Sequence, residues 1–284
     1  MPARLIGATD THRQGRPARA SGRVGRVHDV PDHAEPSPTP NGVTHATRAG
    51  ASRHRVQAVL VDFHGTLAQV EPAHDWVVAA AATCGVELER MRATALADRL
   101  LTAGRAGGPL PARVPPRLAE LWADRDLYEH AHRAAYTGLA ETVDAGIEGF
   151  AEALYERVLA PEGWVPYPDT APVLTALRDA GIPVAVVSNI GFDIRPHFAA
   201  WGLADLVDAY ALSYEVGRCK PDPGIFLRAC GMLRVDPERT LMVGDTPADA
   251  GAVAAGCGVL VLPAAGPGRP SGLGTVLDLA LPSP

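Results

Sequence analysis

Five short apolar runs mark the chain after residue 56 and predict buried β-strands. They cover residues 57–62, 184–188, 208–213, 240–244 and 258–262. Strands that are apolar at nearly every position are typical of a parallel sheet that is covered on both faces. Helical patterns alternate with the later runs, at 170–180, 193–202, 222–233 and 248–256, and a closing helix is predicted at 273–280. The alternation predicts an α/β fold, a Rossmann-like parallel sheet with helices on both faces.

The stretch after the first run has a different pattern. Helical periods without a convincing strand occur at 74–84, 87–103, 116–136 and 139–160, interrupted by the loop GRAGGPLPARVPP. This pattern predicts an all-helical cap over residues 72–164, inserted into an α/β core that is formed by residues 56–71 and 165–284. We expect the cap to lie above the carboxyl ends of the strands, where open α/β sheets bind ligands.

Residues 1–55 differ from the rest of the chain in composition. They contain no aromatic residue and are rich in Arg, Gly, Pro, Ser, Thr and His. Such a segment cannot bury enough apolar surface to offset the entropy that is lost on ordering. The composition predicts a disordered N-terminal tail.

Charge and cysteine content exclude several classes of function. The tail holds nine Arg and four acidic residues, so a net charge of −6 for the whole chain leaves −11 for the rest. An acidic folded part argues against nucleic acid as a partner. No apolar run approaches the roughly 18 residues of a membrane span. The four cysteines show no CxxC spacing, which indicates reduced thiols and a cytoplasmic protein.

Polar residues stand at the points where the predicted strands end. Asp62 ends the first run, Ser188 the second, and Lys220 follows the third, while Asp245 and Asp249 follow the fourth. An aspartate at such a point can simply cap a helix. Because the carboxyl ends of parallel strands meet at one edge, however, we expect these side chains to converge.

Lys220 is unusual in its own right. The chain has 26 Lys and Arg residues together, and Lys220 is the only lysine. Lysine offers a compact point charge, whereas arginine imposes the planar fork of a guanidinium group. We interpret this single lysine as a charge that must fit between a carboxylate and a phosphate.

Together these residues favour phosphoryl transfer. Carboxylate oxygens are the ligands that Mg²⁺ prefers, and the cation would offset the charge between an anionic nucleophile and a phosphate. A lysine, a serine hydroxyl and loop N–H groups could bind the phosphoryl oxygens. Attack by Asp62 would form an aspartyl-phosphate, which water then hydrolyses.

The motifs VLVDFHGTLAQV, VVSNIG, GRCKPDPGIF and VGDTPADAGAVAAG occur in the order found in haloacid dehalogenase-like (HAD) hydrolases. The chain resembles the HAD subfamily with a helical cap inserted after the first motif, and the resemblance covers residues 57–263. It implies that Asp62 is the nucleophile and a metal ligand. The other metal ligands would be the backbone carbonyl of His64, Asp245 and Asp249.

The resemblance also implies a set of phosphate-binding residues. These are Thr66, Ser188, Asn189 and Lys220. Gly65 would permit the tight turn of the first motif. The implied enzyme is a Mg²⁺-dependent phosphatase that hydrolyses small phosphate monoesters through an aspartyl-phosphate.

His64 departs from the usual motif of the family, Asp-x-Asp-Gly-Thr, in which the second aspartate protonates the leaving group. An imidazole can serve as acid and base near neutral pH, so His64 is a candidate catalytic residue. A purely structural histidine is the alternative.

Two other functions stay open. Metal-independent 2-haloacid dehalogenases use the same nucleophile without a leaving-group acid, and a non-catalytic HAD-fold binding or regulatory protein would need neither. Two carboxylates in GDTPAD favour a metal and phosphate. Possible substrate-facing residues in the cap are His74, Asp75, Trp76, His130, His132, Arg133 and Tyr136.

Overall fold

The predicted apolar runs form one five-stranded sheet in a computed structural model, which describes residues 56–263, 265–266 and 268–281. The predicted tail, residues 1–55, lies outside the described residues. The strands are β1 (Ala58–Val61), β4 (Val184–Ser188), β5 (Ala209–Leu212), β6 (Thr240–Gly244) and β7 (Gly258–Val261). Their order is β5-β4-β1-β6-β7, and every neighbouring pair is parallel. The prediction of a parallel α/β sheet is confirmed.

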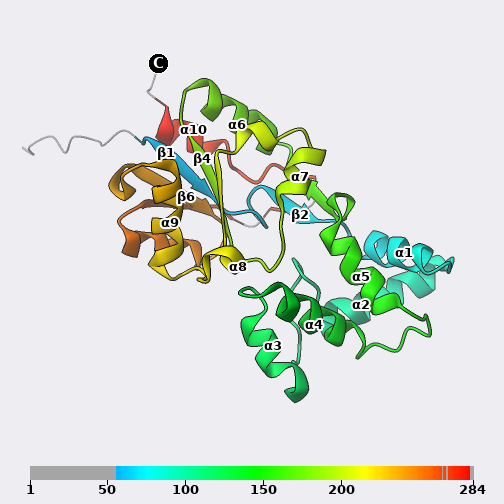
Figure 1. Ribbon diagram of the computed structural model, residues 1–284. Helices are drawn as coiled ribbons and strands as arrows, with labels where there is room; N and C mark the ends of the chain where they lie inside the picture. Colours follow the sequence, from blue (N-terminus) through cyan, green and yellow to red (C-terminus); the bar gives the residue numbers. More distant parts are fainter. Residues whose placement is uncertain (1–55, 264, 267, 282–284) are drawn as a thin grey trace, which may run out of the picture. The chain divides into compact units, whose positions relative to one another are not determined.

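Helices cover both faces of this sheet (Figure 1). One face packs on α6 (Thr170–Asp179), α7 (Arg195–Ala200) and α10 (Thr275–Ala280). The other packs on α9 (Pro223–Leu233) and the 3-10 helix η5 (Asp249–Ala255). Successive side chains of β1 point to opposite faces, so Val59 and Val61 join the first core and Leu60 joins the second. The helical pattern predicted at 248–256 is present as the 3-10 helix η5.

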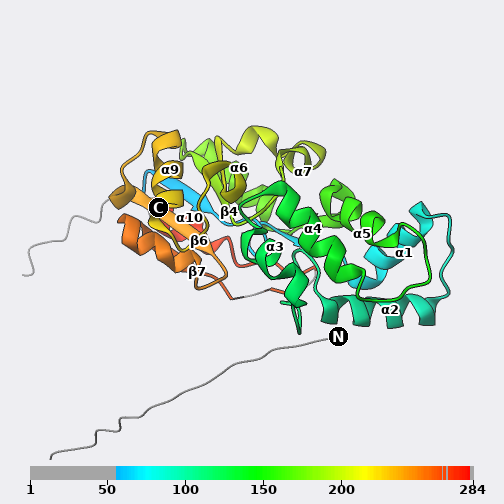
Figure 2. The ribbon, with the colours of Figure 1, turned by 60° about the horizontal axis from the view of Figure 1, so that its bottom comes forward.

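The predicted helical stretch lies between two short strands and holds five α-helices. These are α1 (Ala73–Thr83), α2 (Arg90–Ala103), α3 (Ala119–Asp124), α4 (Glu129–Ala140) and α5 (Phe150–Leu159). A 3-10 turn, η1 (Pro116–Leu118), precedes α3. Apolar residues of α1, α2, α4 and α5 form a hydrophobic cluster of their own, which includes Trp76, Leu100 and Leu154. Figures 1 and 2 show these helices gathered on one side of the sheet, in the direction in which β1 points.

Two of the predicted helices in this stretch are wrong in length. The helix predicted at 116–136 is interrupted before α4, because Tyr128 has extended backbone angles. The helix predicted at 139–160 is interrupted after Ala140, and α5 begins only after Gly149, whose φ of 72° is left-handed. Glycine adopts this conformation without the steric cost that other residues incur, and the left-handed residue directly precedes the first turn of α5.

A small antiparallel pair, β2 (Ala68–Val70) with β3 (Trp164–Pro166), was not predicted. It brings together residues nearly a hundred positions apart, and strands of three residues are too short to show a period of two. We call the chain between these strands, residues 71–163, the insertion. Short 3-10 turns at Pro161–Gly163, Ala204–Leu206 and Pro237–Arg239 complete the connections.

The described residues belong to one compact unit, so the division into a core and a cap at residues 72 and 164 stays a prediction. Among the described helices, each is too short or too polar to cross a bilayer.

Candidate active site

The strand-end residues converge at the carboxyl edge of the sheet. Asp62 directly follows β1, Ser188 is the last residue of β4, and Asp245 directly follows β6. Asp249 opens η5, and Lys220 lies between the short helix α8 (Ser213–Val216) and α9. The parallel connections therefore bring the three carboxylates and Lys220 together from three loops, while Ser188 ends its strand at the same edge.

Three carboxylates form the centre of the site. Ligand oxygens of Asp62, Asp245 and Asp249 all lie within 4.8 Å of one another. Asp62 is 6% exposed and Asp249 is completely buried. Such a set of hard oxygen donors fits Mg²⁺, which binds through carboxylates and keeps several of its waters.

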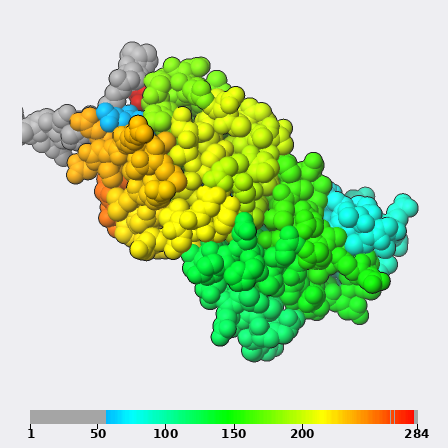
Figure 3. Space-filling model, viewed as in Figure 1, coloured from blue at the N-terminus to red at the C-terminus, as the bar shows by residue number. Residues whose placement is uncertain are grey.

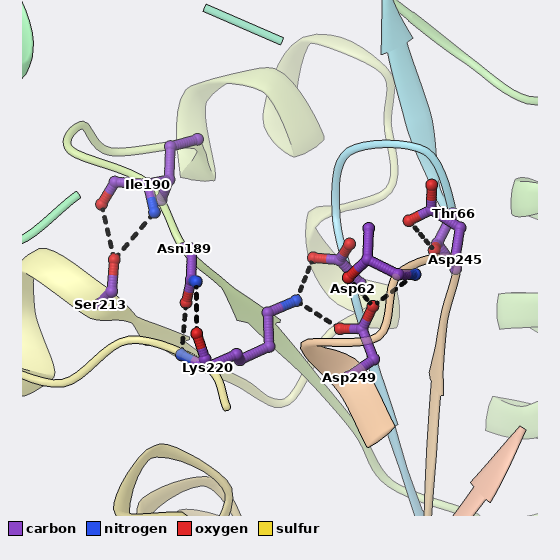
Figure 4. Close-up of polar contacts among 9 residues, drawn as sticks. Asp62, Thr66, Asn189, Ile190, Ser213, Lys220, Asp245 and Asp249 are labelled. Atoms are coloured by element: carbon purple, nitrogen blue, oxygen red, sulfur yellow. Dashed lines mark hydrogen bonds and ion pairs between the residues drawn. The ribbon is translucent and has the colours of Figure 1, made fainter. Parts of the chain in front are cut away.

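Lys220 bridges two of these carboxylates. Its ammonium group donates to Asp62 Oδ1 and to Asp249 Oδ1, both at 2.6 Å (Figure 4). The side chain is 3% exposed, so its charge is compensated by these carboxylates rather than by water. The compact ammonium makes two charged hydrogen bonds in a closed space, to two carboxylates. Its expected contact with a phosphate stays a prediction.

Burial and charge shift the pKa values of these groups. Burial and the charges of Asp249 and Asp245 raise the pKa of Asp62 to about 6, against the opposing attraction of Lys220. Burial and Asp249 also raise the pKa of Asp245. Burial disfavours the ammonium of Lys220, but the neighbouring carboxylates outweigh it and raise its pKa. The crowded negative charge is what a bound cation would relieve.

Asp249 is held by protein donors on both of its oxygens. Oδ1 accepts from Lys220, while Oδ2 accepts from the backbone N–H of Thr246 at 2.9 Å and from its hydroxyl at 2.7 Å. The sequence analysis did not single out Thr246. Its position three residues before Asp249, in a turn that opens a helix, was the available signal.

The first motif folds as a tight turn against the same centre. Gly65 has φ 86°, and a side chain there would collide with the carboxylate of Asp245. The Thr66 hydroxyl, which is fully buried, points at Asp245 Oδ1 from 3.5 Å. Thr66 therefore lies against a predicted metal ligand, whereas its predicted phosphate contact stays a prediction.

His64 lies at the rim of the site, half-buried and edge-on to Trp164 with ring centroids 5.7 Å apart. Burial lowers the pKa of its imidazole, with a smaller opposing effect from Asp62. The glycine-rich loop after α2 reaches this ring: a side chain at Gly107 would stand 3.5 Å from His64 Cδ2. The imidazole therefore lies between the core and the insertion.

Arg105, in the same loop, is a site neighbour that the sequence analysis missed. It is 3% exposed, donates from Nη1 to the Glu71 carbonyl at 2.8 Å, and its charge contributes to the lowered pKa of His64. Burial lowers the pKa of Arg105 itself to about 10. The sequence signal that could have identified it is an arginine placed between two glycines, Gly104 and Gly107.

The two residues at the end of β4 have different positions. Ser188 is 2% exposed and ends its strand at the carboxyl edge. The side-chain amide of Asn189 bonds the backbone of Lys220: Nδ2 donates to the Lys220 carbonyl at 2.9 Å, and Oδ1 accepts from its N–H at 2.6 Å. Asn189 thus fixes the segment that carries the lysine. The phosphate contact expected of Asn189 stays a prediction.

Most of the candidate substrate-facing residues of the insertion are engaged elsewhere. His74 contacts Asp75 on the surface, and the Trp76 indole donates to the Leu154 carbonyl inside the insertion core. His132 packs on Tyr136 and forms a hydrogen bond with the Tyr155 hydroxyl. Arg133 forms ion pairs with Glu152 and Glu156. The His130 ring packs beside Tyr128. None of these contacts joins them to the carboxylate centre.

Comparisons with known proteins agree with this geometry. A family model described as haloacid dehalogenase-like hydrolase matches residues 56–256. A phosphoglycolate phosphatase of Cupriavidus necator is 33% identical over 225 residues, which cover 76% of this chain and 86% of that protein. A phosphoglycolate phosphatase of Neisseria meningitidis is 29% identical over 73% of this chain and 80% of that protein.

A solved structure described as a dehalogenase shares the fold, with a TM-score of 0.55 and 23% identity over 80% of this chain and 98% of that one. At this identity the likeness concerns the fold alone. The family model, by contrast, spans most of the described residues, and the Cupriavidus protein aligns over most of both chains. The chain is an enzyme that belongs to the haloacid dehalogenase-like hydrolases.

Proposed function

We propose that this hydrolase is a Mg²⁺-dependent phosphatase of small phosphate monoesters that acts through an aspartyl-phosphate. The observation that carries the proposal is the buried cluster of three carboxylates with Lys220 between two of them. A dehalogenase reaction needs one carboxylate nucleophile and no cation, and without a cation the charges of Asp245 and Asp249 crowd Asp62.

The four free cysteines support the predicted reducing, cytoplasmic setting.

Each residue has a distinct part in the proposed reaction. Asp62 attacks phosphorus, and the leaving alkoxide departs with a proton, which leaves an acyl phosphate that water then hydrolyses. The Lys220 ammonium and the Ser188 hydroxyl bind phosphoryl oxygens. Asp62, Asp245, the His64 carbonyl and Asp249 would hold Mg²⁺, which supplies charge neutralisation for the transferring group.

The substrate class follows from the relatives. Two of them bear the name phosphoglycolate phosphatase, so 2-phosphoglycolate is the first member of the panel to test. We expect the purified chain to release phosphate from small phosphate monoesters in the presence of Mg²⁺ and to stop when EDTA is added in excess. Restored activity after Mg²⁺ is returned controls for damage by the chelator. Halide release from a 2-haloacid that persists in EDTA would replace this proposal with the dehalogenase reaction.

His64 is proposed to protonate the leaving group, and the choice of substrate tests this. Alkyl phosphates expel a strongly basic alkoxide, whereas nitrophenyl phosphate expels a stabilised phenolate that needs little help. General acid catalysis contributes roughly 10²–10⁴-fold, so His64→Ala should slow alkyl phosphates by that order and nitrophenyl phosphate much less. The comparison holds when formation of the aspartyl-phosphate limits both rates.

His64→Asp is the matched variant, because it restores the usual motif of the family. We expect it to recover most of the activity on alkyl phosphates. Equal slowing of both substrates by His64→Ala would assign the imidazole to packing against Trp164 and the Gly107 loop rather than to proton transfer.

A further inference from the structure

The segment that carries Lys220 is held by a short chain of hydrogen bonds. The Asn189 side chain forms two hydrogen bonds with the backbone of Lys220, from Nδ2 to the carbonyl at 2.9 Å and from the N–H to Oδ1 at 2.6 Å. The next residue, Ile190, donates its backbone N–H to the Ser213 hydroxyl at 2.8 Å. Ser213 is fully buried at the start of α8. Figure 4 shows this series running from Ser213 through the 189–190 turn to Lys220.

The insertion contacts this series at its far end. The Ser213 hydroxyl accepts from the N–H of Ile190, and its single proton lies between two acceptors, the backbone carbonyl of Asp126 in the loop between α3 and α4 and the carbonyl of Ile190. The thiol of Cys219, the residue before Lys220, also points at the Asp126 carbonyl, from 3.8 Å. One carbonyl of the insertion therefore contacts both Ser213 and Cys219, the residue before Lys220.

Gly191 makes the contact close. A side chain at this position would stand 2.5 Å from the Arg125 carbonyl and would collide with the Cβ of His132. Only a residue without a side chain lets the backbone at 191 come this close to the Arg125 carbonyl and to His132. Figure 3 shows the boundary on one face of the molecule, where green atoms of the insertion meet yellow atoms of the core.

We propose that Ser213 and Gly191 are positioning residues, which couple docking of residues 125–128 of the insertion to the placement of Lys220. The inference rests on the proposed function, in which Lys220 binds the transferring phosphoryl group. The coupling needs no contact between the insertion and the ammonium itself. It acts through the Asp126 carbonyl, the Ser213 hydroxyl and the 189–190 turn, because each is hydrogen-bonded to the next.

Separate measurement of kcat and KM for the variants tests the proposal. Ser213→Ala should lower kcat roughly 10-fold or more, with a smaller change in KM, because displaced catalytic groups cost more in the transition state. Ser271→Ala is the control, since Ser271 is 2% exposed and bonds Asp169 at a different place in the fold. Equal losses in the two serine variants would mean that Ser213 serves stability only.

A double-mutant cycle identifies the route. Asn189→Ala and Ser213→Ala act on one series, so the double variant should be scarcely slower than the slower single variant. Ser213→Ala combined with Ser271→Ala should give losses that multiply. Losses that multiply for the Asn189 pair as well would overturn the proposed route.

Gly191→Ala tests the contact from the other direction. It should separate the 125–128 loop from the core and reduce kcat as Ser213→Ala does. Gly231→Ala is the matched control, because Gly231 lies in α9, where an added Cβ would meet nothing within 4 Å, and alanine favours a helix. Wild-type turnover of Gly191→Ala would refute the close-approach argument.

Hydrogen–deuterium exchange separates this proposal from the proposed function, because it requires no turnover. In Ser213→Ala the amides of residues 189–191 and 125–128 should exchange faster together, by about 10-fold or more if the segments open as one unit. Faster exchange in one segment alone would refute the coupling. A wild-type chain without phosphatase activity would refute the function and leave the exchange result to decide the coupling.

Discussion

Replacement of Asp62 by asparagine should abolish phosphate release. An amide is a poor nucleophile, and loss of a nucleophile typically costs more than about 10⁴-fold in kcat. The fold should tolerate the change, because Lys220 keeps its bond to Asp249 and one of three crowded carboxylates loses its charge. We therefore expect an inactive variant whose melting temperature equals or exceeds that of the wild type.

The covalent intermediate gives a second measurement for the same residue. Acid quenching during turnover should leave a phosphoryl group on the peptide that contains Asp62, and Asp62→Asn should show none. Asp98→Asn, an exposed change on α2, is the control and should behave as the wild type. Phosphate release at more than about a tenth of the wild-type rate in Asp62→Asn would contradict a nucleophilic role.

Replacement of Lys220 by arginine should be nearly as damaging, although the charge is kept. The ammonium donates to two buried carboxylates from a position that is 3% exposed, and a planar guanidinium does not fit the same space with the same geometry. Loss of one electrostatic group at a reacting centre typically costs about 10²–10³-fold in kcat, and we expect at least that here.

Arg218→Lys is the complementary control for Lys220→Arg. Arg218 is exposed, pairs with Asp222 at 2.8 Å and lies two positions away, so lysine can make the same pair. Its kcat should stay near the wild-type value. If Lys220→Arg is as active as Arg218→Lys, the site needs only a positive charge and not a compact one.

The sequence predicted the sheet and most of the catalytic centre because both depend on local patterns. Continuous apolar runs marked the five strands, and parallel connection then required Asp62, Lys220 and Asp245 to meet at one edge. The predictions failed where a distant part of the chain decides the local structure. β2 and β3, for example, pair residues that flank the insertion. The helices predicted at 116–136 and 139–160, by contrast, failed for a local reason, because Tyr128 is extended and Gly149 is left-handed.

The sequence by itself determined the identity and order of the candidate groups, because Asp62, Lys220 and the paired aspartates of GDTPAD occur in motifs that a single chain can display. Only the tertiary structure decided what those groups contact. It joined the Asn189 amide to the backbone of Lys220, surrounded both oxygens of Asp249 with donors, and brought the Asp126 carbonyl to Ser213. Such contacts join residues that are distant in sequence, and their hydrogen bonds depend on ångström-scale geometry that no spacing of residues encodes.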